Sequence, residues 1–253
     1  MSGTVYLVGA GPGAADLLTV RAARLLAEAD IVFHDALVPR EVLALAARAE
    51  KVAVGKRSGR RSAVQQFINK QLADAARRHR VVVRLKGGDP TLFGRAHEEL
   101  SFLKAQNIPV KIVPGVTAAL AAAAELGVSL TRRGLARSVA FVTPRVGEGL
   151  PASSWVRAAR TADTVAIYMG AGEAAAIAAA LLEAGKPAST PAIVVENASL
   201  EAAIAAGTLA QLPELAARCG DGPAVVMVGE ALREVAAAQA AAPRRARNAS
   251  HSA

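Results

Sequence analysis

Short apolar runs, most of them bounded by glycine or proline, alternate along the chain with stretches in which alanine and leucine recur at helical spacing. The runs predict strands and the periodic stretches predict helices. In the first half of the chain, strands are expected at residues 4–8, 31–34, 81–85 and 111–113. Helices are expected at residues 17–29, 40–46, 95–105 and 117–126, the last with Thr117 in position to cap its start.

The second half repeats this alternation. Strands are expected at residues 138–143, 164–168, 192–195 and 224–228, and helices at residues 174–184 and 209–219. Alternating strands and helices are typical of a mostly parallel sheet with helices packed on it. The pattern therefore predicts an α/β fold of two lobes, each with a mostly parallel or mixed sheet, and a cleft between the lobes.

The expected domain boundaries follow from this pattern. The N-terminal lobe is expected at residues 1–116 and the C-terminal lobe at residues 117–235. From residue 236 the chain is alanine-rich and then strongly basic, with no apolar stripe that a core could bury. Residues 236–253 are therefore expected to be a disordered tail.

The composition indicates where such a protein works. The chain has 253 residues, 53% of them hydrophobic, which is enough for a full core without disulfides or metals. Its single cysteine, Cys219, cannot form an intrachain disulfide. The longest apolar stretches, residues 116–126 and 174–182, are shorter than the ~20 residues needed to span a bilayer. With no signal-like leader, we expect a cytoplasmic protein with no membrane partner.

The net charge of +9 favours an anionic partner, either nucleic acid or a small molecule with many carboxylates or phosphates. Aromatic residues make up only 3% of the chain, and no basic helix stands out, so we expect no nucleic acid. A basic surface that serves only solubility stays open as an alternative.

A glycine-rich string, Gly9-Ala10-Gly11-Pro12-Gly13-Ala14, directly follows the first predicted strand. It satisfies the GxGxxG/A pattern of dinucleotide-binding loops, and Asp30 stands 21 positions after Gly9. Pro12, however, removes an N–H group that a pyrophosphate cradle would use. A nicotinamide or flavin site and a simple tight turn therefore both stay open.

Polar or glycine-containing loops also follow four further predicted strands. They are His34-Asp35, Lys86-Gly87-Gly88-Asp89-Pro90, Pro114-Gly115-Val116-Thr117 and Tyr168-Met169-Gly170. Ligands of α/β proteins bind at the carboxyl ends of strands. The loops together predict one ligand crevice built from several strand ends.

Asp35 and Lys56 are the best candidates for proton transfer, because burial and mutual charge can bring the pKa of either group toward the working pH. Each could instead have only a structural role. The four histidines have neither metal-ligand spacing nor a cysteine partner, so no metal site is expected.

Nine strings resemble a known family, and the resemblance runs in order from about Val5 to Leu232. They are VYLVGAGPG (5–13), HDALV (34–38), VGKR (54–57), RLKGGDP (84–90), FGR (93–95), VPGVTAA (113–119), LTRRG (130–134), YMG (168–170) and VEN (195–197). Together they resemble the uroporphyrinogen-III C-methyltransferases of the tetrapyrrole methylase family. KGGDPxxFGR with YMG separates that branch from its precorrin and diphthine relatives.

The resemblance implies a homodimer that transfers methyl groups from S-adenosyl-L-methionine to C2 and C7 of uroporphyrinogen III, with S-adenosyl-L-homocysteine released and no metal involved. The product would be precorrin-2, which feeds siroheme and cobalamin synthesis. Because the strings include no dehydrogenase/chelatase module, the enzyme is expected to stop at precorrin-2.

The resemblance also implies the site residues. The cofactor-binding positions are Pro12, Gly87, Gly88, Asp89, Leu92, Thr117, Ala118, Met169 and Ala198, the last standing where the family usually has glycine. Asp35 and Lys56 match the proton acceptor and the proton donor. Arg95, Arg132 and Arg133 are candidates to bind the carboxylates of the substrate, since arginine pairs with carboxylates in bidentate geometry.

Two alternatives stay open. A methyltransferase that acts on a later precorrin would share the fold and the cofactor but not the first substrate. A dinucleotide-binding oxidoreductase would use the glycine-rich string at residues 9–14 for a different cofactor.

Overall fold

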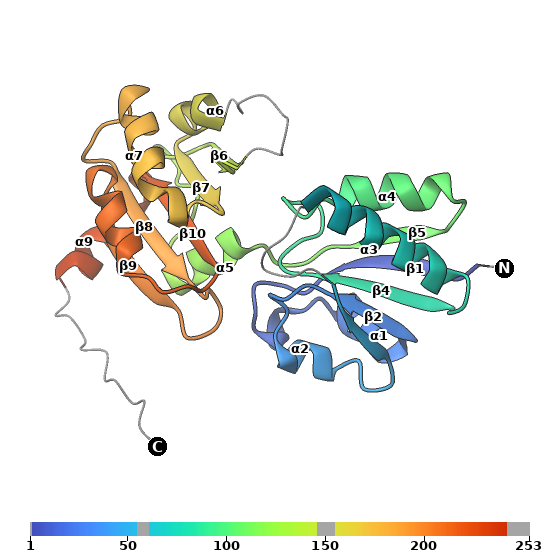
Figure 1. The fold of residues 1–253 in the computed structure, drawn as a ribbon. Coiled ribbons are helices and arrows are strands. Elements are labelled where there is room, and N and C mark those ends of the chain that lie inside the picture. Colours follow the sequence, from blue (N-terminus) through green and yellow to red (C-terminus); the bar gives the residue numbers. More distant parts are fainter. Residues whose placement is uncertain (1, 55–60, 146–154, 242–253) are drawn as a thin grey trace, which may run out of the picture. The chain divides into compact units, whose positions relative to one another are not determined.

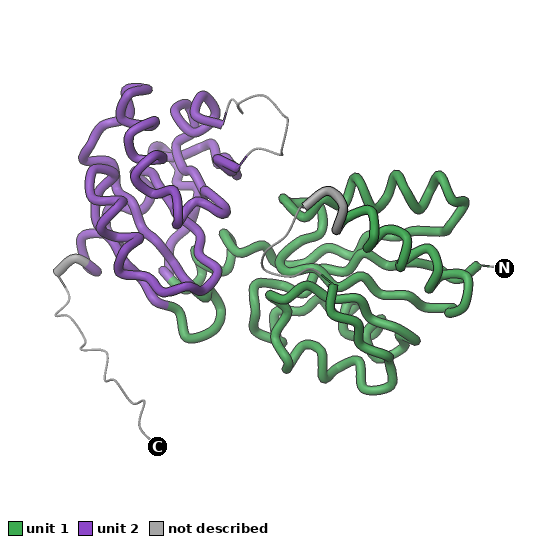
Figure 2. The backbone as a smooth tube through the Cα atoms, in the orientation of Figure 1, with its two compact units in different colours: residues 1–125, 197–202 green, residues 126–196, 203–253 purple. Residues whose placement is uncertain are grey.

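The computed structural model describes residues 2–54, 61–145 and 155–241 (Figure 1). The chain divides into two compact units (Figure 2). Unit 1 holds residues 1–125 and 197–202, and unit 2 holds residues 126–196 and 203–253. Each unit is built around its own five-stranded sheet.

The sheet of unit 1 is parallel throughout. Its strands are β1 (Thr4–Gly9), β2 (Ile31–His34), β3 (Glu50–Ala53), β4 (Val81–Lys86) and β5 (Val110–Val113). They lie in the order β3-β2-β4-β1-β5, and each neighbouring pair is parallel. All six residues of β4 are buried, because this central strand is covered on both faces.

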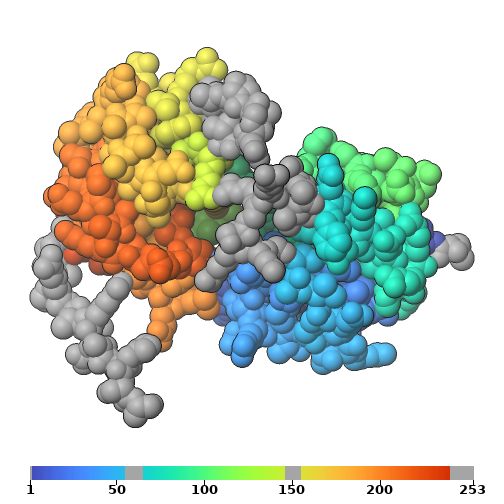
Figure 3. All heavy atoms as spheres, viewed as in Figure 1, coloured from blue at the N-terminus to red at the C-terminus, as the bar shows by residue number. Residues whose placement is uncertain are grey.

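Helices cover both faces of this sheet (Figure 1). They are α1 (Val20–Glu28), α2 (Arg40–Ala44), α3 (Arg61–Ala76) and α4 (Ala96–Ala105). Unit 1 also contains α5 (Ala118–Glu125) and a short 3-10 helix at Ala15–Leu17. Leu26 of α1 packs with Val83 on one face, and Leu72 of α3 packs with Val82 on the other. Atoms of α1 to α4 form much of the visible surface of unit 1 in the space-filling view (Figure 3).

The sheet of unit 2 is mixed. Its strands are β6 (Val139–Val142), β7 (Thr164–Tyr168), β8 (Pro191–Glu196), β9 (Ala203–Thr208) and β10 (Ala224–Gly229), in the order β6-β7-β10-β8-β9. β6 and β7 pair in parallel, and the other pairs are antiparallel. The helices are α6 (Trp155–Thr161), α7 (Ala174–Glu183), α8 (Leu212–Ala217) and α9 (Arg233–Ala241), with 3-10 helices at Ala171–Glu173, Leu209–Gln211 and Glu230–Leu232.

The structure confirms the predicted α/β class with two sheets. Strands β2 and β7 begin and end at the residues that the apolar runs predict. The sequence pattern does not predict β3, β9, α3 or α6. Among the described residues, no helix is long and apolar enough to cross a membrane.

The two units differ from the predicted lobes. Unit 1 extends through α5 to Glu125, beyond the predicted boundary at residue 116, and it also takes in residues 197–202. One contact that groups these segments joins α5 to Ser199, whose backbone N–H donates to the Glu125 carboxylate at 3.1 Å.

The prediction of disorder from residue 236 is wrong for residues 236–241. They belong to α9, which packs against β8 and β9, and Ala236 is buried. Alanine has the highest helix propensity, so this stretch forms a helix once one face can pack on the sheet. Residues 242–253 lie outside the described part of the chain.

Candidate active site

The loops after β1 and β4 leave neighbouring strands toward opposite faces of the unit 1 sheet. The chain after β1 leads to α1 on one face, and the chain after β4 leads to α4 on the other. Strand order therefore reverses between β1 and β4. Open α/β sheets bind ligands in the crevice outside the carboxyl ends of strands at such a point.

Backbone contacts hold three glycine-containing loops together there. The Gly88 N–H donates to the Gly11 carbonyl at 2.7 Å, and the Gly11 N–H donates to the Gly88 carbonyl at 3.2 Å. A Cβ on Gly9 would lie 2.6 Å from the Gly115 Cα, and one on Gly115 would lie 2.4 Å from the Gly88 oxygen. Since real Cβ atoms do not approach so closely, the loops after β1, β4 and β5 can meet only through glycine.

In front of the β4 loop, by contrast, the structure leaves space. Within 4 Å, the only described residue that an ideal Cβ on Gly87 would meet is Leu37, at 3.7 Å, and for one on Gly88 it is Thr117, whose Cα is 3.9 Å away. Gly88 also has a φ of +66°, which glycine adopts without strain. The backbone of Gly87 and Gly88 is therefore open to a ligand at the predicted crevice.

Asp89 ties the β4 loop to the β5 loop. One carboxylate oxygen accepts from the backbone N–H and the hydroxyl of Thr91, at 2.8 and 2.5 Å. The other accepts from the Gly115 N–H at 2.9 Å. Both carboxylate oxygens thus bond to other parts of the protein. Asp89 is a predicted cofactor position, and it also holds the two loops of the crevice together.

The structure brings most of the other predicted cofactor positions into unit 1. Pro12 follows Gly11 directly, Leu92 is half-buried in the turn after β4, and Thr117 is buried next to Gly88. α5 begins at Ala118, directly after Thr117.

Ala198 is also in unit 1, although it lies between two strands of unit 2 in the sequence. It is buried, and the hydroxyl of neighbouring Ser199 accepts from the Ala14 N–H at 3.1 Å. Residues 197–202 therefore pack on the glycine-rich loop. The two segments are far apart in the sequence, so the sequence does not predict that they are in contact.

Met169 belongs to unit 2, at the end of β7. It has a φ of +57°, and the residue is 43% exposed. A left-handed, exposed methionine is unusual, and such backbone conformations gather at functional sites.

A cavity of about 370 Å³ lies elsewhere in unit 1, beside the loop that follows the glycine-rich string. It is lined by Ala14, Asp16, Leu17, Ala121, Ala124, Glu125 and Ser199. None of the predicted cofactor residues lines it, so this cavity does not mark the predicted crevice.

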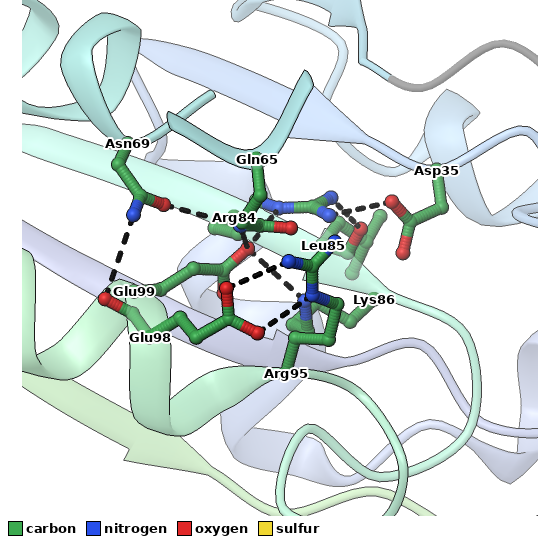
Figure 4. Close-up of polar contacts among 9 residues, drawn as sticks. All are labelled: Asp35, Gln65, Asn69, Arg84, Leu85, Lys86, Arg95, Glu98 and Glu99. Carbon is green, nitrogen blue, oxygen red and sulfur yellow. Dashed lines mark hydrogen bonds and ion pairs between the residues drawn. The ribbon is translucent and has the colours of Figure 1, made fainter. Parts of the chain in front are cut away.

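Asp35 follows β2 directly, at the same edge of the sheet. Its Oδ1 accepts from Arg84 Nη2 at 2.5 Å, and its side chain is 33% exposed (Figure 4). The carboxylate is therefore held by a buried cation while part of it faces outward, as a proton acceptor requires. Lys56, its predicted partner, lies outside the described residues.

Behind Asp35 lies a cluster of buried polar groups between β4, α3 and α4 (Figure 4). Glu99, on α4, is fully buried, and its Oε1 accepts from Arg84 Nε, Lys86 Nζ and Gln65 Nε2, each at 3.1 Å. Gln65 also donates to Asn69 at 3.1 Å. Burial and the nearby Arg84 charge lower the pKa of Lys86.

Arg84 and Glu99 are not among the functional residues that the sequence predicts, and Lys86 is there only as the first residue of a predicted loop. The available signal was the string RLK at the end of an otherwise apolar run, which places two cations on one face of a buried strand. Buried cations need an anionic partner, and here Glu99 supplies it.

The three predicted substrate arginines are all exposed. Arg95 makes a bidentate contact with Glu98, with both N–O distances 2.7 Å, and this contact lowers the pKa of Glu98. Arg132, in unit 2, contacts Glu234 at 2.8 Å. Arg133 follows it with no ion pair to any described residue. Carboxylates of a ligand could therefore take over contacts that two of these arginines already make.

The position of Asp30 argues against a dinucleotide-binding site. Asp30 precedes β2, and its Oδ2 accepts from the backbone N–H groups of Arg80 and Val81 at 2.9 and 2.8 Å. It thus lies at the amino ends of β2 and β4, whereas a ribose-binding acid must lie at the carboxyl ends. Asp30 ties two strand starts together instead.

The family model of Tetrapyrrole (Corrin/Porphyrin) Methylases matches residues 4–213. The chain belongs to the tetrapyrrole methylase family. This confirms the predicted family, fold and enzyme class.

Among the residues that the structure describes, no three His, Cys, Asp or Glu side chains lie together in a way that could hold a metal ion.

Individual relatives refine the match. The chain is 47% identical over 232 residues to the siroheme synthase of Chromobacterium violaceum, covering 90% of this chain and 49% of the relative. It is 43% identical over 233 residues to that of Actinobacillus pleuropneumoniae, covering 91% and 48%. The chain thus spans about half the length of these curated relatives.

Solved structures match along most of their length. Uroporphyrin-III C-methyltransferase from Thermus thermophilus, in complex with S-adenosyl homocysteine, is 42% identical, with a TM-score of 0.80 and coverage of 92% of this chain and 94% of the other. A cobalt precorrin-4 methyltransferase is 28% identical, with a TM-score of 0.80 and coverage of 90% and 95%.

Proposed function

We propose that this protein uses S-adenosylmethionine to methylate uroporphyrinogen III at C2 and C7, giving precorrin-2. The observation that carries the proposal is the open space in front of Gly87 and Gly88, at the point where strand order reverses between β1 and β4. The 42% identity to a Thermus enzyme with S-adenosyl homocysteine bound supports the choice of cofactor.

The residues at this crevice fit such a cofactor. Pro12, Gly87 and Thr117 would contact it, and Gly88, whose N–H and carbonyl bond to Gly11, would allow its close approach because it has no side chain. Asp89 would keep the loops in place through its bonds to Thr91 and Gly115. When bound, the cofactor supplies an electrophilic methyl group on a sulfonium.

The protein's part in the reaction is to position the substrate and to take up a proton. Positioning the reacting pyrrole carbon in line with the methyl group removes much of the barrier without a covalent intermediate. The new carbon–carbon bond leaves the pyrrole system cationic, and loss of a proton restores its neutrality. In this proposal Asp35 accepts that proton, and two observations support the role: Arg84 holds one of its oxygens, and part of the carboxylate is exposed.

Arg95, Arg132 and Arg133 would bind the carboxylates of the tetrapyrrole. Their exposure makes them accessible to a large anion, and guanidinium–carboxylate pairs are among the stronger charge-assisted bonds. The same proposal includes a homodimer, which sedimentation of the purified protein tests directly.

A methyltransferase for a later precorrin is the second candidate. The cobalt precorrin-4 enzyme shares the fold at a TM-score of 0.80. Its identity to this chain is 28%, against 42% for the Thermus enzyme, so the observations favour uroporphyrinogen III.

One assay tests the proposal. Purified protein is incubated with methyl-labelled S-adenosylmethionine and uroporphyrinogen III, and the product is analysed by mass and by the position of the label. We expect two methyl groups, at C2 and C7. Transfer to a later precorrin, with none to uroporphyrinogen III, would support the second candidate instead.

A further inference from the structure

We infer that Glu99, on helix α4, is a positioning residue for the reaction: it holds Arg84, and Arg84 in turn holds the Asp35 carboxylate. The inference rests on the proposed function, because Asp35 is the proton acceptor there. Glu99 itself is fully buried, so it acts only through its neighbours.

The contacts form a continuous chain from α4 to the end of β2 (Figure 4). Glu99 Oε1 accepts from Arg84 Nε at 3.1 Å, and Arg84 Nη2 donates to Asp35 Oδ1 at 2.5 Å. Arg84 Nη1 also donates to the Leu85 carbonyl at 3.1 Å. Three hydrogen bonds in three directions fix the plane of the guanidinium, and hence the direction in which its Nη2 group donates to Asp35.

Charge explains why this chain of contacts needs Glu99. Arg84 and Lys86 stand two residues apart on one face of β4, and both side chains are at least 96% buried. Two buried cations so close together repel each other, and Glu99 is the carboxylate that contacts both. Without its charge, Arg84 would lose the anchor that orients it toward Asp35.

The two oxygens of Glu99 are used unequally. Oε1 accepts three hydrogen bonds, whereas Oε2, also buried, has no partner among the described residues. A buried carboxylate with an unpartnered oxygen is expensive if its only purpose is to satisfy donors. The arrangement is better explained by a requirement for negative charge at Oε1, beside Arg84.

The first experiment does not depend on turnover. In protein labelled with carbon-13 at the aspartate carboxyls, the Asp35 signal is identified by its loss in Asp35→Asn. At neutral pH we expect Glu99→Gln to move this signal in the same direction as Arg84→Lys does, because both changes loosen the contact between Arg84 and Asp35. Glu28→Gln, at an exposed position on α1 on the opposite face of the sheet, is the matched control and leaves the signal in place.

The second experiment is a double-mutant cycle on methylation. Glu99→Gln removes the charge and keeps the shape, and we expect it to lower kcat about tenfold or more, since a displacement of about 1 Å can cost about 10²-fold. The KM for S-adenosylmethionine stays as it is. In the Asp35→Asn background, Glu99→Gln has no further effect, because its effect on the reaction passes through Asp35.

A second variant covers the case in which Glu99→Gln does not fold because Lys86 is left unpaired. The double change Lys86→Met and Glu99→Gln removes one charge of each sign and keeps the volumes similar. We expect the same displaced Asp35 signal and the same loss of kcat from this variant.

The outcomes separate the two proposals. An unmoved Asp35 signal, or losses that multiply in the cycle, overturns the role of Glu99 while leaving the methyltransferase proposal standing. A moved signal in a protein that does not methylate uroporphyrinogen III supports the link from Glu99 to Asp35 and counts against the proposed function alone.

Discussion

At the residue scale, the candidate site depends on glycines, which have no Cβ, and on charged side chains that are held in place by buried partners. Gly9 and Gly115 allow three loops to touch, while Gly87 and Gly88 leave space in front of the same loops. Asp35 is held from behind by Arg84. Two substitutions separate the binding of the cofactor from the chemistry.

Gly88→Leu is expected to abolish binding of S-adenosylhomocysteine, measured by calorimetry, because the new side chain enters the open space at the crevice. The φ of +66° adds strain of about 1–2 kcal/mol. Gly185→Leu is the control, since Gly185 also has a positive φ, +89°, with nothing within 4 Å of a Cβ. If Gly88→Leu folds and binds as well as this control, the cofactor lies against another loop.

Asp35→Asn keeps the shape of the side chain and removes its basicity. We expect kcat for methylation to fall about 10²-fold or more, the usual size of a general-base contribution. Affinity for S-adenosylhomocysteine is expected to change little, because the Asp35 carboxylate bonds to Arg84 and is not one of the predicted cofactor positions. Turnover close to that of the unmodified protein would leave Asp35 with the structural role of pairing with Arg84.

At the element scale, strand starts are tied together by aspartates. In unit 2, the Asp163 carboxylate, just before β7, accepts from the Ser138 hydroxyl at 2.7 Å and from the N–H groups of Arg137 and Ser138 at 2.8 and 2.9 Å. These bonds favour the ionised form, so they lower the pKa of Asp163, the Ser138 hydroxyl most of all.

A lowered pKa in the folded state predicts a loss of stability in acid. The contribution of Asp163 is complete above its ordinary pKa of 3.8 and is lost as the pH falls below that value toward the folded-state pKa. Asp163→Asn should therefore lower the urea midpoint at pH 6 and have a smaller effect at pH 3. Asp221→Asn, at an exposed position, is the control; an equal effect of Asp163→Asn at both pH values would contradict the linkage.

The elements also show what sequence patterns can and cannot predict. β2 and β7 are apolar, buried strands, and their bounds follow from composition. β3 reads EKVA with two exposed charges, and β9 reads AIAAGT, so each has few of the residues that strands prefer. Their pairing with β2 and β8 makes them strands, and that is a tertiary effect.

The candidate site also has parts that the sequence predicts and parts that it does not. Loops that directly follow apolar strands, such as Lys86 to Pro90, could be identified from the sequence because their position alone indicates ligand binding. The contact of Ser199 with Ala14 joins residues 185 positions apart, and the pairing of Glu99 with Arg84 depends on how α4 packs on β4. Neither contact has a local signal in the sequence.

At the scale of the whole molecule, the net charge of +9 suits a substrate that carries many carboxylates. Two of the predicted anchors, Arg132 and Arg133, are adjacent in unit 2 and exposed. Arg132 pairs with Glu234, whose side chain is 78% exposed, so the pair contributes little to stability and can be exchanged for a substrate carboxylate.

Changing both Arg132 and Arg133 to Gln should raise the KM for uroporphyrinogen III far more than the KM for S-adenosylmethionine. It should also weaken the dependence of the former KM on salt, because screening acts only on the charges that remain.

Arg157→Gln with Arg160→Gln, both exposed on α6, removes the same charge elsewhere in unit 2. If the rise in the KM for uroporphyrinogen III came from the change in net charge alone, this control would raise that KM equally. If Arg132 and Arg133 serve folding or the contact between subunits, sedimentation would show dissociated or unfolded protein and both KM values would rise together. A selective rise for the tetrapyrrole, in a protein that sediments as the unmodified one does, is the result that anchoring predicts.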